Sequence, residues 1–243
     1  MKPTPDQVLF AHVVDRPEDE VQLDVAALMV GEWEYEGLDV SHYLALLDGF
    51  AEQVTKTLES QEKTRHAGIR ALNKVLFDKL GFRGDEDDYY DPRNSFLNEV
   101  IDRRVGNPIS LSVIYLEVAR RLGLDIVGVA FPGHFLVRYD DDDGESLIID
   151  PFHMGLTLDA EDLQARLDGA GGIDTELTPD LLAPASKKQV LTRMLANLAN
   201  IYRRDGDVYR SIHCLERLKI LTPDDYKIEA ELGRLRRRES ELN

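Results

Sequence analysis

The sequence predicts an α+β fold, and three features of the 243-residue chain support this prediction. Apolar residues recur every three or four positions between residues 40 and 58, which is the period of an amphipathic helix. Residues 108–122 are apolar on nearly every side, which is typical of a buried helix. Three short runs rich in β-branched and aromatic residues follow between residues 126 and 150, with turn-forming residues between them. We therefore expect helices first and a small sheet second.

The first part of the chain, residues 1–90, is predicted to be the helical part of the core. Asp39 is a candidate cap for the helix over residues 40–58. A second amphipathic pattern runs from Ile69 to Leu80, and Gly81 follows where a left-handed residue would end the helix. Each of these helices must bury one face against the rest of the core.

The second part, residues 91–184, is predicted to be the α+β core itself. Asp91-Pro92 and Asn107-Pro108 each combine a side chain that caps a helix with a proline suited to its first position. The expected strands are the runs IVGVAF, HFLVRY and LIID. Asp140 to Asp143 with Gly144 has the composition of the turn between the last two runs.

The end of the core is predicted from a change in composition. A short helix and a glycine-rich loop are expected between Ala160 and Gly172. The dipeptides Thr178-Pro179 and Ala183-Pro184 indicate a linker. We therefore place a domain boundary near residue 184.

The last part, residues 185–243, is predicted to be a helical hairpin with a closing helix. Gly206 separates two apolar helical faces, Pro223 ends the second, and a charged helix follows from Asp224 to Arg238. The order and spacing of these residues resemble the tetratricopeptide repeat, although a generic helical hairpin that completes the core remains an equal alternative. A single repeat cannot bury its own face, so we expect the hairpin to pack on the preceding domain.

The composition of the chain limits its possible functions and its possible cellular location. The formal net charge of -17 disfavours binding of nucleic acid through a basic face. No run approaches the roughly 20 apolar residues of a membrane span, and the first 20 residues do not resemble a signal peptide. The single cysteine, Cys214, cannot form an internal disulfide. We expect a cytoplasmic protein without a membrane segment.

Three residues have the types and the chain order of a nucleophile, a base and an orienting acid. Ser110 lies at the start of the apolar helix, His134 opens one strand, and Asp150 closes another. If the turn between these strands is centred on Asp142, then His134 and Asp150 lie opposite each other on one face of the sheet. The pattern therefore predicts a hydrogen-bonded pair of these two side chains.

Alternatives to catalysis exist for each of these residues. The hydroxyl of Ser110 can instead bond a free backbone N–H beside the cap residue Asn107. The pair of His134 and Asp150 can simply tie two strands together. Asn107 and His153 are candidate binding residues beside the pair. His134, Asp150 and His153 have the ligand types of a zinc site, but we predict no metal and no cofactor.

The sequence also resembles a known family. The segments GNPISLSVIYLEVARRLGL, FPGHFLVRY and LIIDPFH resemble the transglutaminase-like core of bacterial SirB-type proteins, which are described as transglutaminase-like and tetratricopeptide-repeat regulators. The resemblance implies a papain-like arrangement of Cys, His and Asp, whose histidine matches His134 and whose aspartate matches Asp150. The position of the cysteine falls near Pro108, so the resemblance implies a site without a thiol.

Two functions follow as expectations. The resemblance implies a pseudoenzyme that acts as a regulatory or scaffolding protein and binds a protein or peptide partner, without direct contact to nucleic acid. The alternative is a serine-dependent acyl or amide transferase or hydrolase. In it Ser110 attacks, His134 is the general base, and Asp150 orients the imidazole.

Overall fold

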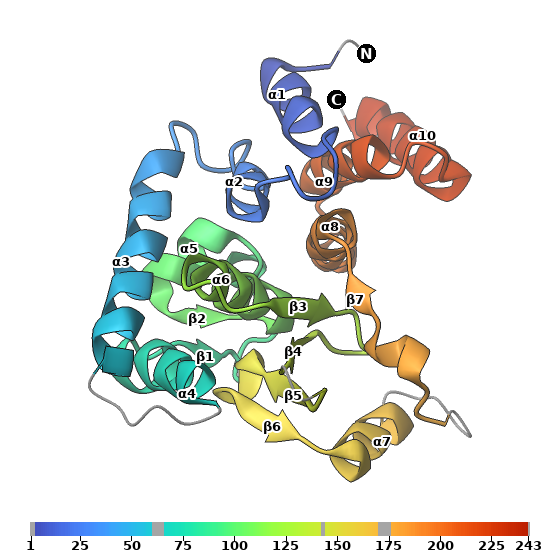
Figure 1. Ribbon diagram of the computed structural model, residues 1–243. Helices are drawn as coiled ribbons and strands as arrows, with labels where there is room; N and C mark the ends of the chain where they lie inside the picture. The colour runs from blue at the N-terminus through green and yellow to red at the C-terminus, as the bar shows by residue number, and fades with distance from the viewer. Residues whose placement is uncertain (1–2, 60–65, 142–143, 170–175, 243) are drawn as a thin grey trace.

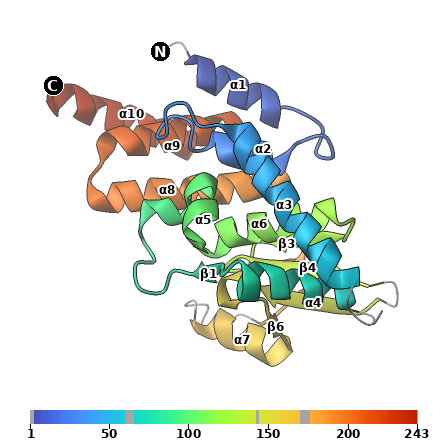
Figure 2. The same cartoon turned by 90° about the vertical axis from the view of Figure 1, so that its left-hand side faces the viewer.

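The protein is built around one antiparallel sheet. A computed structural model describes residues 3–59, 66–141, 144–169 and 176–242 (Figure 1). Five strands form the sheet in the order β6-β5-β4-β3-β7. Helix α6 (Pro108–Arg121) lies on one side of the sheet and α7 (Ala160–Gly169) on the other (Figures 1 and 2). The predicted α+β class is confirmed.

The strands and helices have the following bounds. The main sheet consists of β3 (Ile126–Val129), β4 (Leu136–Asp140), β5 (Ser146–Asp150), β6 (Leu156–Leu158) and β7 (Pro184–Ala185). A second sheet pairs β1 (Arg83–Gly84) in parallel with β2 (Val105–Gly106). The remaining α-helices are α1 (Pro5–Val14), α2 (Leu23–Met29), α3 (Val40–Glu59), α4 (Ala67–Asn73), α5 (Leu97–Arg103), α8 (Lys187–Asp205), α9 (Val208–Leu221) and α10 (Tyr226–Leu242).

The two helices predicted within residues 1–90 are present in the structure. The helix over residues 40–58 is α3, and the second pattern is α4 followed by a π-helical segment, Lys74–Lys79. Gly81 has a φ of 74°, in the left-handed region that ends a helix without strain. Asp91 accepts a hydrogen bond from the backbone of Arg93, but it starts only a 3₁₀ turn before α5.

Helix α6 is the centre of the larger core. Twelve of its 14 residues are buried, as its all-round apolar sequence predicts. Asn107 caps the helix, since its Oδ1 accepts a hydrogen bond of 3.0 Å from the backbone of Ser110. Gly123 has a φ of 71° just after the last turn. Because both ends are specified locally, the helix is short and well bounded.

The alternation of side chains along the sheet divides the protein into two apolar clusters. Val137 and Ile149 face α6 and belong to the larger cluster. Leu136 and Ile148, their chain neighbours, face α7 and belong to the smaller one. This is the two-residue period expected of strands that are covered on both faces.

The predicted linker near residue 184 is wrong in one respect. Pro184 and Ala185 form β7, which pairs with Val129 and Gly128 of β3 at the edge of the sheet. A proline fits there because an edge strand leaves some N–H positions unused. The larger cluster continues from α6 into the last three helices without a break. The glycine-rich loop predicted after Gly169 lies outside the described residues.

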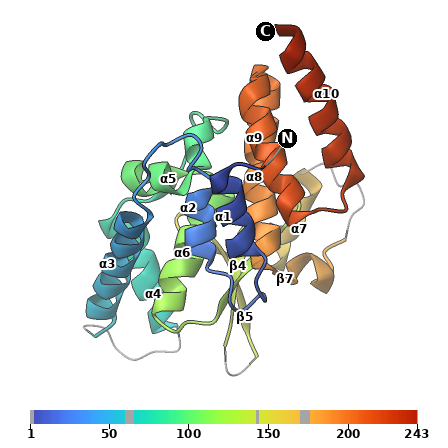
Figure 3. The same ribbon diagram turned by 90° about the horizontal axis from the view of Figure 1, so that it is seen from above.

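The C-terminal helices pack against the core, as the sequence predicts. Helices α8 and α9 are antiparallel, with Gly206 in the left-handed region between them, and α10 packs on α9 (Figure 3). Trp33, which lies between α2 and α3, makes edge contacts to Phe96 of the core and to Tyr202 of α8. Its indole ring also stacks on His213 of α9, with ring centroids 4.8 Å apart.

Helix α1 lies on the C-terminal helices although it is far from them in sequence (Figure 3). Phe10 is fully buried, and Asp6 forms an ion pair with Arg217 of α9, whose side chain is only 1% exposed. Both ends of the chain therefore contribute to one helical layer. Within the described ranges, no helix combines the length and apolarity needed to cross a membrane.

Candidate functional site

Asp150 is the centre of the candidate site. It is the last residue of β5, and its side chain is fully buried. Its Oδ1 lies 2.9 Å from Nε2 of His134, and its Oδ2 lies 2.7 Å from Nδ1 of His153. Nη2 of Arg166 lies 2.9 Å from the same Oδ2. The structure therefore brings together His134 and Asp150, as predicted, and adds two further residues.

The backbone after β5 also holds the carboxylate. Asp150 caps the 3₁₀ turn of Pro151–His153, and its Oδ1 accepts a hydrogen bond of 3.0 Å from the N–H of Phe152. Burial by itself raises the pKa of the Asp150 carboxyl. The hydrogen bond and charge of His134, followed by those of His153, outweigh burial and lower the pKa below its usual 3.8. Asp150 is therefore an anion held by its neighbours.

The strand register differs from the predicted one. Val137 pairs with Ile149 and Asp140 with Ser146, whereas a turn centred on Asp142 would pair Asp140 with Gly144. His134 precedes β4 and lies diagonally from Asp150, not directly opposite. The contact still forms because a shift of two residues in pairing keeps both side chains on the same face.

The site lies beside the N-terminus of α6. Phe152, next to Asp150, packs on Gly84, where an added Cβ would come within 2.6 Å of its ring. Gly84 in turn pairs with Gly106, one residue before the cap of α6. Gly84 thus allows the turn that carries Phe152 and His153 to approach the start of the central helix.

Ser110 does not take part in this cluster, contrary to the catalytic prediction. Its side chain is fully buried, and its Oγ donates to the carbonyl of Asn94 over 2.7 Å and accepts from the N–H of Asn107. No hydrogen bond joins Ser110 to His134 among the residues described. The hydroxyl is committed to the helix start because its backbone needs capping partners.

Asn107 is likewise part of the helix start and not of an open binding surface. It is 4% exposed, its Oδ1 caps Ser110, and its Nδ2 donates to Oγ of Ser95 over 2.8 Å. Both polar ends of its side chain are therefore used inside the protein. The predicted binding role of Asn107 is corrected to a structural one.

Arg166 is the functional-site residue that the sequence did not indicate. It comes from α7, and its Nη2 lies 3.5 Å from Nδ1 of His153 as well as beside Asp150. A single arginine on a predicted charged helix gives no sign that it reaches a strand end 16 positions earlier. His153 is 37% exposed and Arg166 26% exposed, so together they form the open side of the cluster.

The ligand types of a metal site are present, but the surroundings do not fit a divalent cation. The donor atoms of His134, Asp150 and His153 lie within 4.8 Å of one another. The guanidinium of Arg166 already lies against both Asp150 and His153, where it supplies the positive charge that a metal would bring. The arrangement fits an ion-paired network better than a coordination shell.

Among the described residues, no thiol or hydroxyl forms a hydrogen bond with His134, whose recorded partner is Asp150. Pro108 occupies the first position of α6, where the family resemblance expects the cysteine. Cys214, the only cysteine of the chain, is fully buried in α9, and burial raises the pKa of its thiol to about 12. Such a thiol is inert as a nucleophile near neutral pH.

Comparison with known proteins agrees with the fold. A sequence profile described as the transglutaminase-like superfamily matches residues 41–196. A UPF0162 protein of Xylella fastidiosa is 40% identical over 219 residues, which cover 89% of this chain and 77% of the relative. A UPF0162 protein of Pseudomonas aeruginosa is 30% identical over 200 residues, covering 82% of this chain and 71% of the relative.

A shorter match reaches a eukaryotic protein. F-box only protein 21 of Mus musculus is 36% identical over 145 residues, which are 57% of this chain and 22% of that protein. The profile covers more than half of this chain, and the bacterial relatives align along most of it. The chain therefore belongs to the transglutaminase-like superfamily and, within it, to the UPF0162 family.

Proposed function

We propose that this chain is a regulatory or scaffolding interaction protein whose transglutaminase-like site lacks a nucleophile. The observation that carries the proposal is the placement of Ser110. Its hydroxyl is fully buried and donates to the carbonyl of Asn94, so it is neither accessible to a substrate nor bonded to His134. A serine nucleophile needs a base within hydrogen-bond reach to lose its proton.

The ion-paired cluster around Asp150 supports a structural role for the transglutaminase-like site. Asp150 bonds His134, His153 and Arg166, which come from the chain before β4, the turn after β5 and helix α7. A buried carboxylate with partners from three segments holds these segments in one arrangement. The pair of His134 and Asp150 then acts as a tie within the fold, with His153 and Arg166 on its open side.

The partner is proposed to be a protein or peptide. The C-terminal helices have the order expected from SirB-type regulators with a tetratricopeptide-like repeat, and they form a layer that α1 completes. The match to F-box only protein 21 covers 22% of that protein, so a similar core also occurs as one part of a longer chain. The net charge of -17 argues against direct binding to nucleic acid. The single cysteine supports a location in the reducing cytoplasm.

The proposal is tested by labelling of the site. Wild type, Ser110→Ala and His134→Ala are treated with a fluorophosphonate probe and with an acyl-ester substrate at neutral pH. We expect the wild type to show no more labelling or turnover than Ser110→Ala. Labelling of Ser110 that disappears in His134→Ala would instead establish the serine-dependent transferase or hydrolase.

A further inference from the structure

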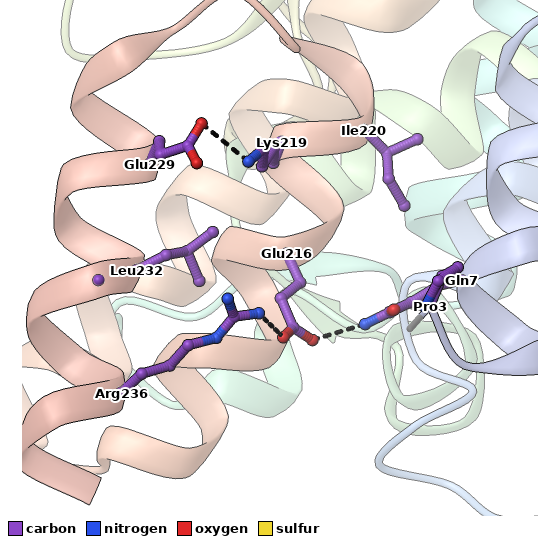
Figure 4. A pocket seen from close by; sticks show the side chains of 9 residues that line it. Pro3, Gln7, Glu216, Lys219, Ile220, Glu229, Leu232 and Arg236 are labelled. Carbon is purple, nitrogen blue, oxygen red and sulfur yellow. Dashed lines mark hydrogen bonds and ion pairs between the residues drawn. The ribbon is translucent and has the colours of Figure 1, made fainter. Parts of the chain in front are cut away.

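A groove lies between the two ends of the chain. Helices α1, α9 and α10 surround a cavity of about 530 Å³, and Figure 4 shows their side chains around it. The size is within the range of sites that hold a ligand or a few side chains of a partner. Ile220 and Leu232 supply apolar surface on α9 and α10, and Gln7 of α1 lies on the opposite side.

Gly233 opens the wall of the groove that α10 forms. It lies inside the helix, where glycine is about 1 kcal/mol less favourable than alanine. An added Cβ would meet only Nη1 of Arg237, at 3.7 Å, so packing within the chain does not require a glycine. The missing side chain allows a ligand to approach the helix backbone closely.

The charge of the chain is distributed unevenly, and the groove lies in its basic part. Residues 185–243 contain 13 Lys and Arg against 9 Asp and Glu, a net charge of +4. Residues 1–184 contain 16 Lys and Arg against 37 Asp and Glu, a net charge of -21. Arg210 and Arg217 are paired with Glu34 and Asp6 of the first part, so the C-terminal helices keep a small positive excess in an otherwise acidic chain. This excess favours an acidic ligand over a basic one.

A basic side chain without an acidic partner lies beside the groove. Glu216 pairs with Arg236 and also accepts from Gln7, and Glu229 pairs with Lys219 (Figure 4). These pairs leave the groove lining neutral. Arg237 of α10 is exposed and has no acidic partner among the described residues, and its side chain reaches to Gly233. The excess charge next to the groove is therefore basic.

We propose that this groove binds an acidic amphipathic segment of a partner protein. Apolar side chains of that segment pack on Ile220 and Leu232, and a carboxylate of the segment pairs with Arg237. This mode places apolar anchors in a preformed groove and charges at its rim, as in other recognition of amphipathic peptides. The inference rests on the proposed interaction function and names the surface and the chemistry of the partner.

The experiment selects ligands without assuming their sequence. Random peptides of about 16 residues, about four turns of helix, are displayed on phage and selected on the full chain. The selected peptides are synthesised, and their affinities for wild type, Gly233→Leu and the matched control Gly233→Ala are measured by fluorescence anisotropy. Leucine at position 233 fills the groove from a site where nothing clashes with its Cβ, so the fold is kept, which circular dichroism verifies.

The expected peptides are rich in Asp and Glu, with apolar residues three and four positions apart. They should bind Gly233→Leu at least about tenfold more weakly than wild type and bind Gly233→Ala within about twofold. Arg237→Glu should weaken them as well, and raising the salt concentration should reduce the affinity for wild type. Peptides rich in Lys and Arg, or peptides that bind Gly233→Leu as well as wild type, would overturn the proposal.

Two other results would also overturn it. If no peptide is selected, the groove is not a peptide site. If wild type sediments as a dimer and Gly233→Leu as a monomer, a second copy of the chain occupies the groove. Neither result alters the labelling of Ser110, which tests the proposed function separately. A chain that is unlabelled but selects no groove peptide remains an interaction protein that uses another surface.

Discussion

At the scale of single residues, the candidate site depends on the buried charge of Asp150. The side chain of Asp150 is fully buried and contacts two histidines, one arginine and a backbone N–H. A buried carboxylate is costly unless such partners compensate its lost hydration. The same contacts that would orient a catalytic imidazole therefore also stabilise the fold.

Removal of the Asp150 carboxylate should destabilise the protein strongly. We expect Asp150→Ala to lower the free energy of unfolding by about 3 kcal/mol, because it leaves His134, His153 and Arg166 without their anion. Asp150→Asn, the matched control, keeps the shape and the cap to Phe152 and should lose less. Urea unfolding measures both, and equal losses would show that charge is unimportant here.

The contribution of this carboxylate should depend on pH with a definite sign. The pKa of Asp150 is lowered in the folded protein, so its stabilisation is complete above the usual value of about 3.9 and is lost as pH falls through the folded value. The difference in unfolding free energy between wild type and Asp150→Asn should therefore shrink below about pH 4. A difference that grows toward acid pH would contradict the lowered pKa.

Position 108 tests whether the site keeps the geometry of its superfamily. Pro108 is the first residue of α6, and this helix packs against the turn Pro151–His153. A cysteine introduced there gains from the helix N-terminus and from a nearby imidazole, both of which favour the thiolate. Pro108→Cys should react with iodoacetamide at pH 7 at least about tenfold faster than buried Cys214. Combining it with His134→Ala should slow this reaction, and an unchanged rate would exclude the contact.

At the scale of elements, two short strands position the site. β1 and β2 are only two residues each, and their pairing brings Gly84 to Gly106 at the start of α6. Phe152 fits against Gly84 only because that residue has no side chain. The approach of the 3₁₀ turn to the central helix thus depends on a glycine more than on any polar contact.

A methyl group at position 84 should disturb this approach. We expect Gly84→Ala to cost about 1 to 3 kcal/mol, because its Cβ would lie 2.6 Å from the ring of Phe152. Gly49→Ala is the control, since nothing lies within 4 Å of its Cβ and the change favours helix α3. Thermal unfolding should show a lower Tm for Gly84→Ala and an equal or higher Tm for Gly49→Ala.

At the scale of the whole molecule, the C-terminal helices belong to the same core as the sheet. The larger apolar cluster runs from α1 through α6 to Leu235 of α10. Leu195 and Leu198 of α8 are fully buried within it. The inner side of the hairpin thus forms part of the core. Its outer side lines the proposed groove.

The molecule should therefore unfold in one step. Trp33, the only tryptophan, contacts Phe96 of the core as well as Tyr202 and His213 of the hairpin, so its fluorescence reports their separation. Fluorescence and far-ultraviolet circular dichroism should give coincident urea transitions. Leu195→Ala should shift both to lower urea by an equal amount, at a cost of about 3 kcal/mol. An earlier fluorescence transition would show that the hairpin detaches independently.

The sequence by itself determined the local features of this protein. The caps Asp91 and Asn107, the turn glycines Gly81 and Gly206, and the buried character of α6 all follow from residues a few positions apart. These features can be predicted from sequence because backbone geometry and helix capping depend on residues within one or two helical turns. The residue types and the expected hairpin predicted the pair of His134 and Asp150, and the family resemblance implied the same two residues.

Only the tertiary structure decided what the site contains. It directed the hydroxyl of Ser110 to Asn94, brought Arg166 to Asp150, shifted the strand register by two residues and placed Pro184 in the sheet. It also placed α1 beside α10 and so created the groove. These contacts join segments far apart in sequence, and they are selected by which surfaces pack together in the folded chain, a choice that no local pattern of residues encodes.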